Sequence, residues 1–416
     1  MPRTNRPISE ITTISRGRHV EAAGASTLAP RLRKTHKLEH PPPFDCVALL
    51  LQGGGALGAY QAGVYEALAE ADLYPDWVAG ISIGGINAAI IAGNPRKVRV
   101  AKLREFWELV SRSPFGFDGY FSSWSATSDA ARDFARYMSA SSATWLGVPG
   151  FYAPRCPSIW FQPPGTIEAT SFYDTTGLRA TLERVIDFDL INSGRSDIRL
   201  SLGSVNVRTG KLVYFDATTD IIRPEHVMAS GALPPGFPAV EIEGEFYWDG
   251  GVVSNTPLEW LARNPLPDTL AFQVDLWAAP GDFPKNLPEV MTRIKDIMNS
   301  SRTMYHTRGY QEINQVYSAL ARFLEELPEE FKRGEDAKYL ISVARRRVHH
   351  LVNLVYQPAS PEGAAKEDEF SRQSIEGRWL AGYHDTVRAL RHPEVLKPAP
   401  GCDAGIFVFD FARDNR

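Results

Sequence analysis

Residues 46–92 constrain the fold of this chain more than any other part of the sequence. The run CVALLLQ (46–52) is short, continuously apolar and followed by glycines, which is typical of a strand buried on both faces. A glycine-rich loop, GGGALG (53–58), leads into a stretch with apolar residues at helical spacing. A second apolar run, WVAGIS (77–82), is followed by the small-residue helix IGGINAAIIAG. Strand, helix, strand and helix in this order form a βαβα unit, which predicts a parallel sheet.

The remaining segments extend this α/β pattern. IRLSLGSVNV (198–207) and LVYFDA (212–217) indicate a hairpin, and TLAFQVDLW (269–277) indicates another core strand. Beyond this strand, long charged amphipathic stretches surround one apolar run, HHLVNLVYQ (349–357). We therefore predict a three-layer αβα sandwich with a mostly parallel central sheet over residues 45–277. We expect a mostly helical C-terminal extension with one added strand, residues 278–416, packed on this sandwich domain.

Composition excludes several classes of protein. The 416 residues are 44% hydrophobic and 23% charged with a net charge of −4, which is typical of a globular chain and gives no sign of nucleic-acid binding. The three cysteines form neither a disulfide framework nor a metal-ligand spacing, which favours a reducing, cytoplasmic compartment. We recognise no signal peptide and no apolar stretch of the roughly 20 residues that a bilayer crossing needs. Residues 1–44, with eight Lys/Arg against three Glu, indicate a disordered basic tail, a basic arm for anionic lipids, or a transit peptide.

The second strand ends in a G-x-S-x-G motif, Gly80-Ile81-Ser82-Ile83-Gly84. In such an elbow a serine lies on a sharp turn between a strand and a helix, and the glycines let neighbouring backbone approach it. The apolar run before Ser82 and the helical run after it match this context. The helix that follows also directs the positive end of its dipole toward Ser82. We interpret Ser82 as a nucleophile; the alternative is an exposed serine in a tight turn.

The glycine-rich loop at Gly53, Gly54, Gly55 and Gly58 follows the neighbouring strand. It lacks the G-K-[ST] of a P-loop, and it matches a dinucleotide-binding pattern only weakly. Because parallel strands end at the same edge of a sheet, we expect this loop to lie beside Ser82. Its backbone N–H groups then suit an oxyanion hole, whereas a dinucleotide site would leave the G-x-S-x-G motif without a role.

A third motif, Asp249-Gly250-Gly251, ends the run GEFYW. By itself it indicates a hairpin turn. Together, however, the glycine loop, the serine motif 29 residues after its start and the Asp-Gly-Gly 167 residues after the serine resemble the patatin-like phospholipase family. The stretch MASGALPPGFPAVEIEGEFYWDGGVVSNTPL (228–258) supports this resemblance, which covers about residues 46–277. The C-terminal part is similar to an extension found in some bacterial members.

The resemblance implies that Ser82 and Asp249 form a catalytic dyad in a lipid acyl hydrolase that needs no metal or cofactor. It also implies that Gly53, Gly54 and Gly55 supply the oxyanion hole. The family usually has Arg or Lys where this chain has Leu57, so a charged contact from that position is absent. A carboxylate of ordinary pKa is a weak base, so the dyad requires burial of Asp249.

Two alternatives remain open from the sequence. An α/β-hydrolase triad would need a histidine late in the chain, for which the candidates are His306, His349, His350, His384 and His392. A degenerate hydrolase fold could instead serve as a non-catalytic lipid-binding module.

Two aromatic, turn-rich stretches bear on the substrate, residues 114–124 and 145–165. The second carries Trp145, Phe151, Tyr152, Trp160 and Phe161 among prolines and glycines, which excludes a regular helix. It indicates either buried aromatic loops, or a lid, an acyl-chain pocket or an interfacial surface. We expect phospholipids or lysophospholipids as substrates and peripheral contact with a membrane. The oligomeric state does not follow from the sequence.

Overall fold

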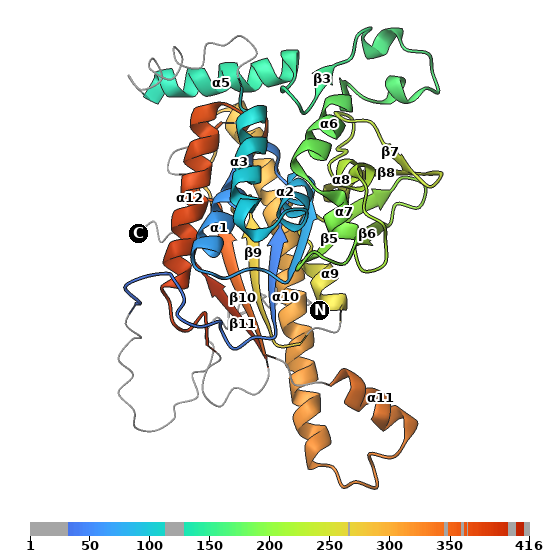
Figure 1. Cartoon of the computed structure of the whole chain (residues 1–416), viewed down its shortest axis with the longest axis vertical. Helices are drawn as coiled ribbons and strands as arrows, with labels where there is room; N and C mark the ends of the chain where they lie inside the picture. Colours follow the sequence, from blue (N-terminus) through green and yellow to red (C-terminus); the bar gives the residue numbers. More distant parts are fainter. Residues whose placement is uncertain are drawn as a thin grey trace, which may run out of the picture.

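A mixed sheet forms the centre of the protein (Figure 1). The computed structural model describes residues 32–112, 129–264, 267–344, 348–358, 362–363, 365–397 and 405–411. Within these residues the sheet has nine strands in the order β11-β10-β9-β1-β2-β5-β8-β7, with β6 paired to β5. Six strands run parallel: β1 (Cys46–Leu51), β2 (Trp77–Ile81), β5 (Arg199–Asn206), β9 (Thr269–Asp275), β10 (Val348–Val355) and β11 (Gly405–Asp410). The antiparallel strands are β6 (Leu212–Asp216), β7 (Val240–Ile242) and β8 (Glu245–Asp249).

Helices cover both faces of this sheet, because the central strands are apolar on both sides. Alternate residues of β1 enter two different cores: Leu49 and Leu51 one, and Ala48 and Leu50 the other. The first core is covered by α1 (Ala59–Glu70), α2 (Ile83–Ala92), α3 (Arg99–Val110), α6 (Thr176–Val185), α8 (Pro224–Ser230) and α12 (Arg372–Leu390). The second is covered by α9 (Leu258–Arg263) and α10 (Leu287–Glu326). This confirms the predicted three-layer αβα arrangement.

The remaining elements lie outside these layers. Helix α5 (Asp129–Leu146) crosses the top of the molecule in Figure 1, and α11 (Glu335–Val343) lies at the opposite end. A small hairpin pairs β3 (Ala153–Pro154) with β4 (Tyr173–Asp174). The short helices are α7 (Phe188–Asn192), η1 (Gly55–Gly58), η2 (Arg96–Val98), η3 (Ile159–Phe161), η4 (Ile167–Thr170), η5 (Gly250–Val252) and η6 (Lys366–Asp368).

The C-terminal region is built into the same body. Strand β10 pairs with β9, and β11 pairs with β10, so this region adds two strands where the sequence indicated one. The second strand covers the backbone hydrogen-bonding edge that β10 would otherwise expose. Helix α12 contacts α1 so closely that a Cβ at Gly63 would lie 1.8 Å from the carbonyl oxygen of Trp379. The Tyr60 hydroxyl also donates to Asp385 of α12 at 2.9 Å.

The expected N-terminal tail divides into two parts. Residues 1–31 lie outside the described residues. Residues 32–44 have no regular helix or strand but run along the body. There the Leu38 N–H donates to the Ala71 carbonyl at 3.3 Å, and Leu38 and Phe44 pack against the first core. The part of the tail nearest the sheet is therefore held to the body.

Candidate active site

Strand β5 brings Ser82 and Asp249 together. One edge of β5 pairs with β6, so β2 and β8 both lie along its other edge. Strand β2 ends with Ile81 opposite Gly203, and the pairing of β8 begins one residue later, with Asp249 opposite Ser204. The residue after β2 and the last residue of β8 therefore meet where the two strands abut.

Ser82 lies on a strained turn between β2 and α2. Its φ of 58° and ψ of −130° place a non-glycine residue in a region that L-amino acids rarely adopt. A Cβ at Gly80 would lie 2.2 Å from the carbonyl oxygen of Gly84, and a Cβ at Gly84 would lie 2.3 Å from that of Leu51. The Ser82 N–H donates to the Ser230 carbonyl at 2.9 Å, which holds the turn in place. The turn thus has the geometry that a nucleophile elbow requires.

The Asp249 carboxyl group is buried against this serine. The residue is 1% exposed, and its carboxylate has a hydrogen bond with the Ser82 side chain and accepts the Gly251 N–H at 2.7 Å. Burial raises the pKa of Asp249 to about 7, and the two hydrogen bonds oppose that rise. A carboxyl group with this pKa is a far better proton acceptor near neutral pH than an exposed aspartate.

The glycine-rich loop approaches Ser82 from β1. A Cβ at Gly53 would lie 2.9 Å from the Ser82 Cβ. However, the Gly53 N–H donates to the Asn255 carbonyl at 3.2 Å, so it is already used. Among the described residues the N–H groups of Gly54 and Gly55 have no internal acceptor. This arrangement narrows the expected oxyanion donors from three to Gly54 and Gly55.

Two side chains fix the orientation of the Gly53 peptide. Its carbonyl oxygen accepts hydrogen bonds from Asn255 Nδ2 and from Trp277 Nε1, both at 2.9 Å. Neither Asn255 nor Trp277 belongs to one of the three sequence motifs. Asn255 lies six residues after Asp249, inside the stretch that carries the family resemblance, and this proximity is the signal that could have revealed it. Ser230 also lies inside this stretch and outside the three motifs. Its hydroxyl donates to the Gly203 carbonyl at 2.8 Å, beneath the turn at Ser82.

The C-terminal region completes the support of this loop. The Gln52 side chain donates to Thr303 of α10 at 3.1 Å, and Asn255 donates to Asn299 of the same helix at 3.3 Å. Gly55 has a φ of +56°, and a Cβ there would lie 2.4 Å from the Glu367 carbonyl oxygen of η6. The loop can therefore adopt this shape only with glycine at position 55.

The other predicted positions support the fold of the site. A Cβ at Gly58 would lie 2.6 Å from Ile83, and one at Gly250 would lie 2.7 Å from the Gly203 carbonyl oxygen. Leu57 is fully buried in the first core and brings no charge. The nearby cation Lys366 is paired with Asp296 at 2.6 Å and lies over the Trp277 ring.

The histidine candidates for a triad are placed elsewhere in the described structure. His349 and His350 lie level with the start of β1, which is about 16 Å from the carboxyl end of that strand at 3.3 Å per residue. His349 bonds the Tyr310 hydroxyl, and His350 bonds the Val395 carbonyl. His384 is exposed on α12, and His392 pairs with Glu394. The side chain of His306 lies outside the described residues.

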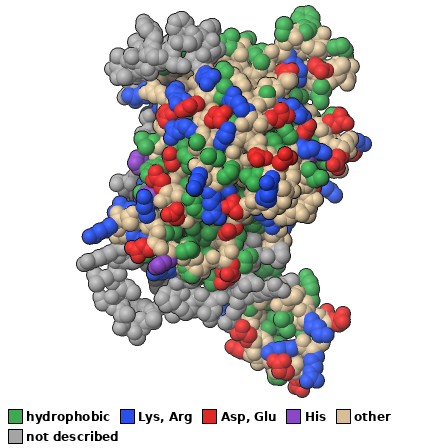
Figure 2. Space-filling model, viewed as in Figure 1, with side chains coloured by type: hydrophobic (Ala, Val, Ile, Leu, Met, Phe, Trp, Pro, Cys, Tyr) green, Lys and Arg blue, Asp and Glu red, His purple; other side chains and the backbone are tan. Residues whose placement is uncertain are grey.

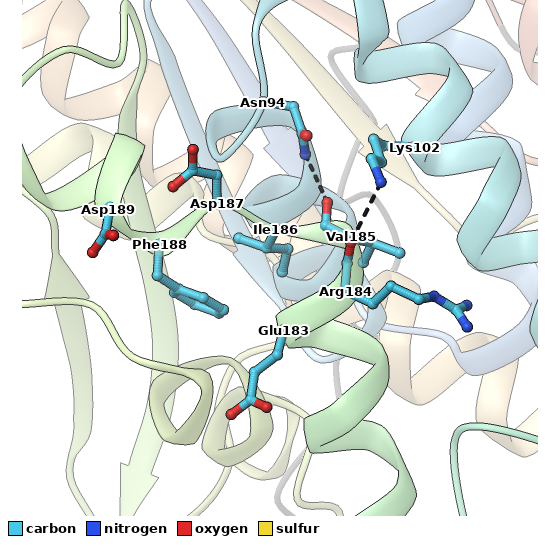
Figure 3. A pocket seen from close by; sticks show the side chains of 9 residues that line it. All are labelled: Asn94, Lys102, Glu183, Arg184, Val185, Ile186, Asp187, Phe188 and Asp189. Atoms are coloured by element: carbon cyan, nitrogen blue, oxygen red, sulfur yellow. Dashed lines mark hydrogen bonds between the residues drawn. The ribbon is translucent and has the colours of Figure 1, made fainter.

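A hollow lined by residues of α2, α3, α6 and α7 and their flanking loops lies in the described surface (Figure 3). It measures about 520 Å³ and lies at the far end of α2, about 15 Å from Ser82 at 1.5 Å per residue. Figure 3 shows that Asn94 and Lys102 bond the carbonyl groups of Val185 and Arg184 there. These two side chains therefore satisfy backbone carbonyl groups, and Ser82 is not among the residues that line the hollow.

Two further features concern metals and membranes. Within the described residues no group of three or more His, Cys, Asp or Glu side chains could hold a metal ion. Among the described helices, none combines the length and the apolar composition that a membrane crossing requires.

The aromatic segment 145–165 divides into buried and exposed residues. Phe151 and Tyr152 are buried, whereas Trp145, Trp160 and Phe161 are 78–82% exposed. Residues 114–124 lie outside the described residues. The expectation of packed aromatic loops therefore applies to only part of the segment.

Comparison with known families identifies the chain. A family model described as patatin-like phospholipase matches residues 49–262, which include all three motifs, and a second, described as patatin phospholipase, matches residues 297–401. The chain belongs to the patatin-like phospholipase family. The second match confirms the expected extension of a patatin-like core and covers most of α10 and all of α12.

Individual relatives of this patatin-like chain are distant. A triacylglycerol lipase, SDP1L of Arabidopsis thaliana, is 37% identical over 65 residues, which are 16% of this chain and only 8% of the lipase. The solved structure of VipD from Legionella pneumophila covers 92% of this chain and 76% of its own, at 16% identity and a TM-score of 0.37. The type III effector ExoU covers 86% of this chain and 55% of its own, at 14% identity and a TM-score of 0.30.

Asn255→Ala tests whether the patatin-like loop depends on this side chain. Without Asn255 Nδ2, the Gly53 peptide loses one of its two fixed donors and the oxyanion groups move, so we expect kcat to fall about 10²-fold with little change in KM. Asn94→Ala is the matched control, because Asn94 is equally buried and also donates to two carbonyl groups, but at the far end of α2. Both variants should lose a similar amount of thermal stability, but steady-state kinetics should show a lower kcat only for Asn255→Ala. Equal kcat values would contradict the positioning role.

Proposed function

We propose that the protein hydrolyses fatty acyl esters of phospholipids or lysophospholipids through a Ser82–Asp249 dyad. The observation that carries this proposal is the hydrogen bond between a serine on a strained elbow and a fully buried carboxylate with a pKa near neutrality. Family membership supports an ester hydrolase of the lipase and phospholipase type. The placement of the described histidines gives no support to a triad.

The dyad would act in two halves. Asp249 accepts the Ser82 hydroxyl proton as Oγ attacks the ester carbonyl carbon, and the Gly54 and Gly55 N–H groups bind the oxyanion. Collapse of this intermediate breaks the bond to the alcohol, which leaves with the proton from Asp249. A water molecule then attacks the acyl-enzyme and gives its proton to Asp249. The second collapse releases the fatty acid, and Ser82 recovers its proton.

The C-terminal region, 278–416, is part of this catalytic unit in our proposal. Support comes from the contacts of Thr303, Asn299 and Glu367 with the two segments that shape the oxyanion loop. Residues 45–277 would supply the reacting groups, while α10 and η6 hold the loop in position. The C-terminal region therefore differs from an independent domain, because the geometry of the oxyanion loop depends on its contacts.

Product analysis on defined lipids tests the proposed reaction. The intact chain is incubated with phosphatidylcholine, lysophosphatidylcholine and triacylglycerol, and mass spectrometry follows free fatty acid and the remaining lipid. We expect fatty acid from one or both phospholipids, and none from Ser82→Ala as the blank. Release of a phosphorylated head group, or no ester cleavage in any lipid, would contradict the proposal. Preferential cleavage of triacylglycerol would instead indicate a triacylglycerol lipase, which is the activity in the plant relative's name.

A further inference from the structure

Exposed aromatic side chains gather at the end of the molecule where the parallel strands finish. Trp160 and Phe161 of η3 are 82% and 79% exposed, and Trp145 at the end of α5 is 78% exposed. Such large apolar side chains are costly to leave in water. Figure 2 shows hydrophobic side chains on the right-hand part of the upper edge, above a band where positive and negative side chains alternate.

Helix α5 directs its apolar side outward. Tyr137, Met138 and Trp145 are exposed and lie on one side at a helical spacing of about 100° per residue. The opposite side presents Ala140 and Ala143 to the body, where both are buried. A helix of a globular protein normally has the reverse arrangement, so α5 is built to meet an apolar partner on its outer side.

Charge is sparse in the middle of this surface, although Asp133 on α5 and Glu168 on η4 are exposed at its borders. Residues 137–167 contain one charged residue, Arg155, although the chain average of 23% predicts about seven in this length. The Arg155 side chain is 8% exposed, and its guanidinium donates to Ser171 inside the β3–β4 segment. A surface with sparse charge and protruding Trp and Phe side chains suits the region between lipid headgroups and acyl chains. Protein interfaces, by contrast, usually have a polar rim.

The aromatic surface is connected to the dyad through one loop. The N–H groups of Phe172 and Tyr173 donate to the Pro235 and Gly236 carbonyls at 3.0 and 2.9 Å. In the same loop, residues 231–237, the Ala232 carbonyl accepts a hydrogen bond from the Asp249 N–H at 3.0 Å.

The inner side of the same segment is apolar. Phe151, Tyr152, Tyr173 and Phe237 pack ring against ring with centroids 4.8–6.1 Å apart. Apolar side chains therefore line the body from the exposed aromatic residues to the loop beside Asp249.

We propose that the outer side of α5 and the η3 turn form a membrane-docking surface, which inserts Trp145, Trp160 and Phe161 among lipid headgroups. This inference rests on the proposed function, because it requires that a lipid ester reach Ser82 directly from the bilayer. Docking on this surface turns the carboxyl end of the sheet, and with it the elbow, toward the lipid. Because charge is sparse around the three inserted side chains, binding is expected to depend little on ionic strength.

Vesicle binding by inactive protein tests the surface separately from catalysis. Flotation with phosphatidylcholine vesicles is measured for Ser82→Ala in about 0.5 M salt, where electrostatic attraction is screened. We expect Trp145→Ser, Trp160→Ser and Phe161→Ser together to lower the vesicle partition constant about tenfold or more, as the loss of large apolar side chains implies. Phe331→Ser with Tyr339→Ser is the control, since both residues are exposed beside α11 at the opposite end, and it should bind like the parent.

Two further measurements make every outcome decisive. With Ser82 restored, the triple variant should hydrolyse a soluble short-chain ester at the parental rate but lose activity on vesicle lipid. Hydrolysis of the soluble ester by neither protein would refute the proposed function while leaving the binding result valid. Where the triple variant fails to fold, Trp160→Phe is used with brominated phosphatidylcholine, and the parental quenching of tryptophan emission should fall. Absence of vesicle binding or quenching in the parent, or unchanged binding in the variant, would overturn the docking surface and favour a protein partner.

Discussion

Ser82→Ala is expected to lower ester hydrolysis by at least about 10⁴-fold, because it removes the hydroxyl group that we propose forms the acyl-enzyme. The variant should fold normally, since alanine fills the same space and the Ser82 N–H still donates to the Ser230 carbonyl. Labelling by a fluorophosphonate probe should disappear in parallel. Hydrolysis of a soluble ester and probe labelling measure the two effects.

Ser204→Ala is the control for this substitution. Ser204 lies opposite Asp249 on β5 and is fully buried, and its hydroxyl has no hydrogen-bond partner in the described structure. Its loss should therefore leave kcat and labelling within about twofold of the parent. Residual labelling of Ser82→Ala at the parental level would show that another residue is the nucleophile.

Asp249→Asn should reduce kcat by about 10³-fold or more, because the amide cannot accept the Ser82 proton. The parent should show kcat/KM for a soluble ester rising with pH through about 7, where Asp249 ionises. The residual activity of the variant should lose this dependence. A pH profile of both proteins is the measurement, and a variant with the parental profile and rate would contradict the role of Asp249 as base.

The same substitution should change stability in the opposite direction. Burial raises the pKa of Asp249 from its ordinary value of 3.8 to about 7, so the folded state holds the proton more tightly than the unfolded chain does. For this group, stability is therefore greatest at acid pH and falls as pH rises toward 7. The loss amounts to at most about 4.5 kcal/mol, at roughly 1.4 kcal/mol per pKa unit.

Asparagine at position 249 removes that loss. Urea unfolding at pH 8 should show the variant to be more stable than the parent, and at pH 4 the difference should vanish. Asp275, whose pKa burial also raises to about 7, remains in both proteins, so part of the pH dependence should persist. A variant less stable than the parent at pH 8 would indicate that the Asp249 carboxylate is not under this strain.

Local sequence patterns were sufficient for most of the sheet and for the elbow. The apolar runs at 46–51 and 77–81 became β1 and β2, and the small-residue run after Ser82 became α2. The predicted hairpin is β5 and β6, and the charged amphipathic stretches contain α10 and α12. These elements were predictable because burial on both faces of a strand, or on one side of a helix, leaves its period in the sequence.

Asn255, Trp277 and the C-terminal contacts could not be predicted in the same way. A hydrogen bond between Gly53 and Asn255 joins residues about 200 positions apart, and no local pattern records such a pair. Likewise, only exposure distinguished Trp160 from Phe151, although both belong to one aromatic, turn-rich segment. Exposure depends on which neighbours fold over a side chain, and the local sequence does not contain that information.

The sequence by itself determined that Ser82 ends a buried strand, begins a helix and lies one strand away from a glycine-rich loop. It also determined, through its three motifs, the family to which the chain belongs. The family resemblance implied that Asp249 lies beside Ser82, and the tertiary structure supplied the cause, because β2 and β8 abut along one edge of β5. Only the tertiary structure decided that Gly53 is already hydrogen-bonded and that α10 and η6 support the loop. The physical reason is that strand pairing and burial are collective properties of distant segments, whereas turns and periodicity are local.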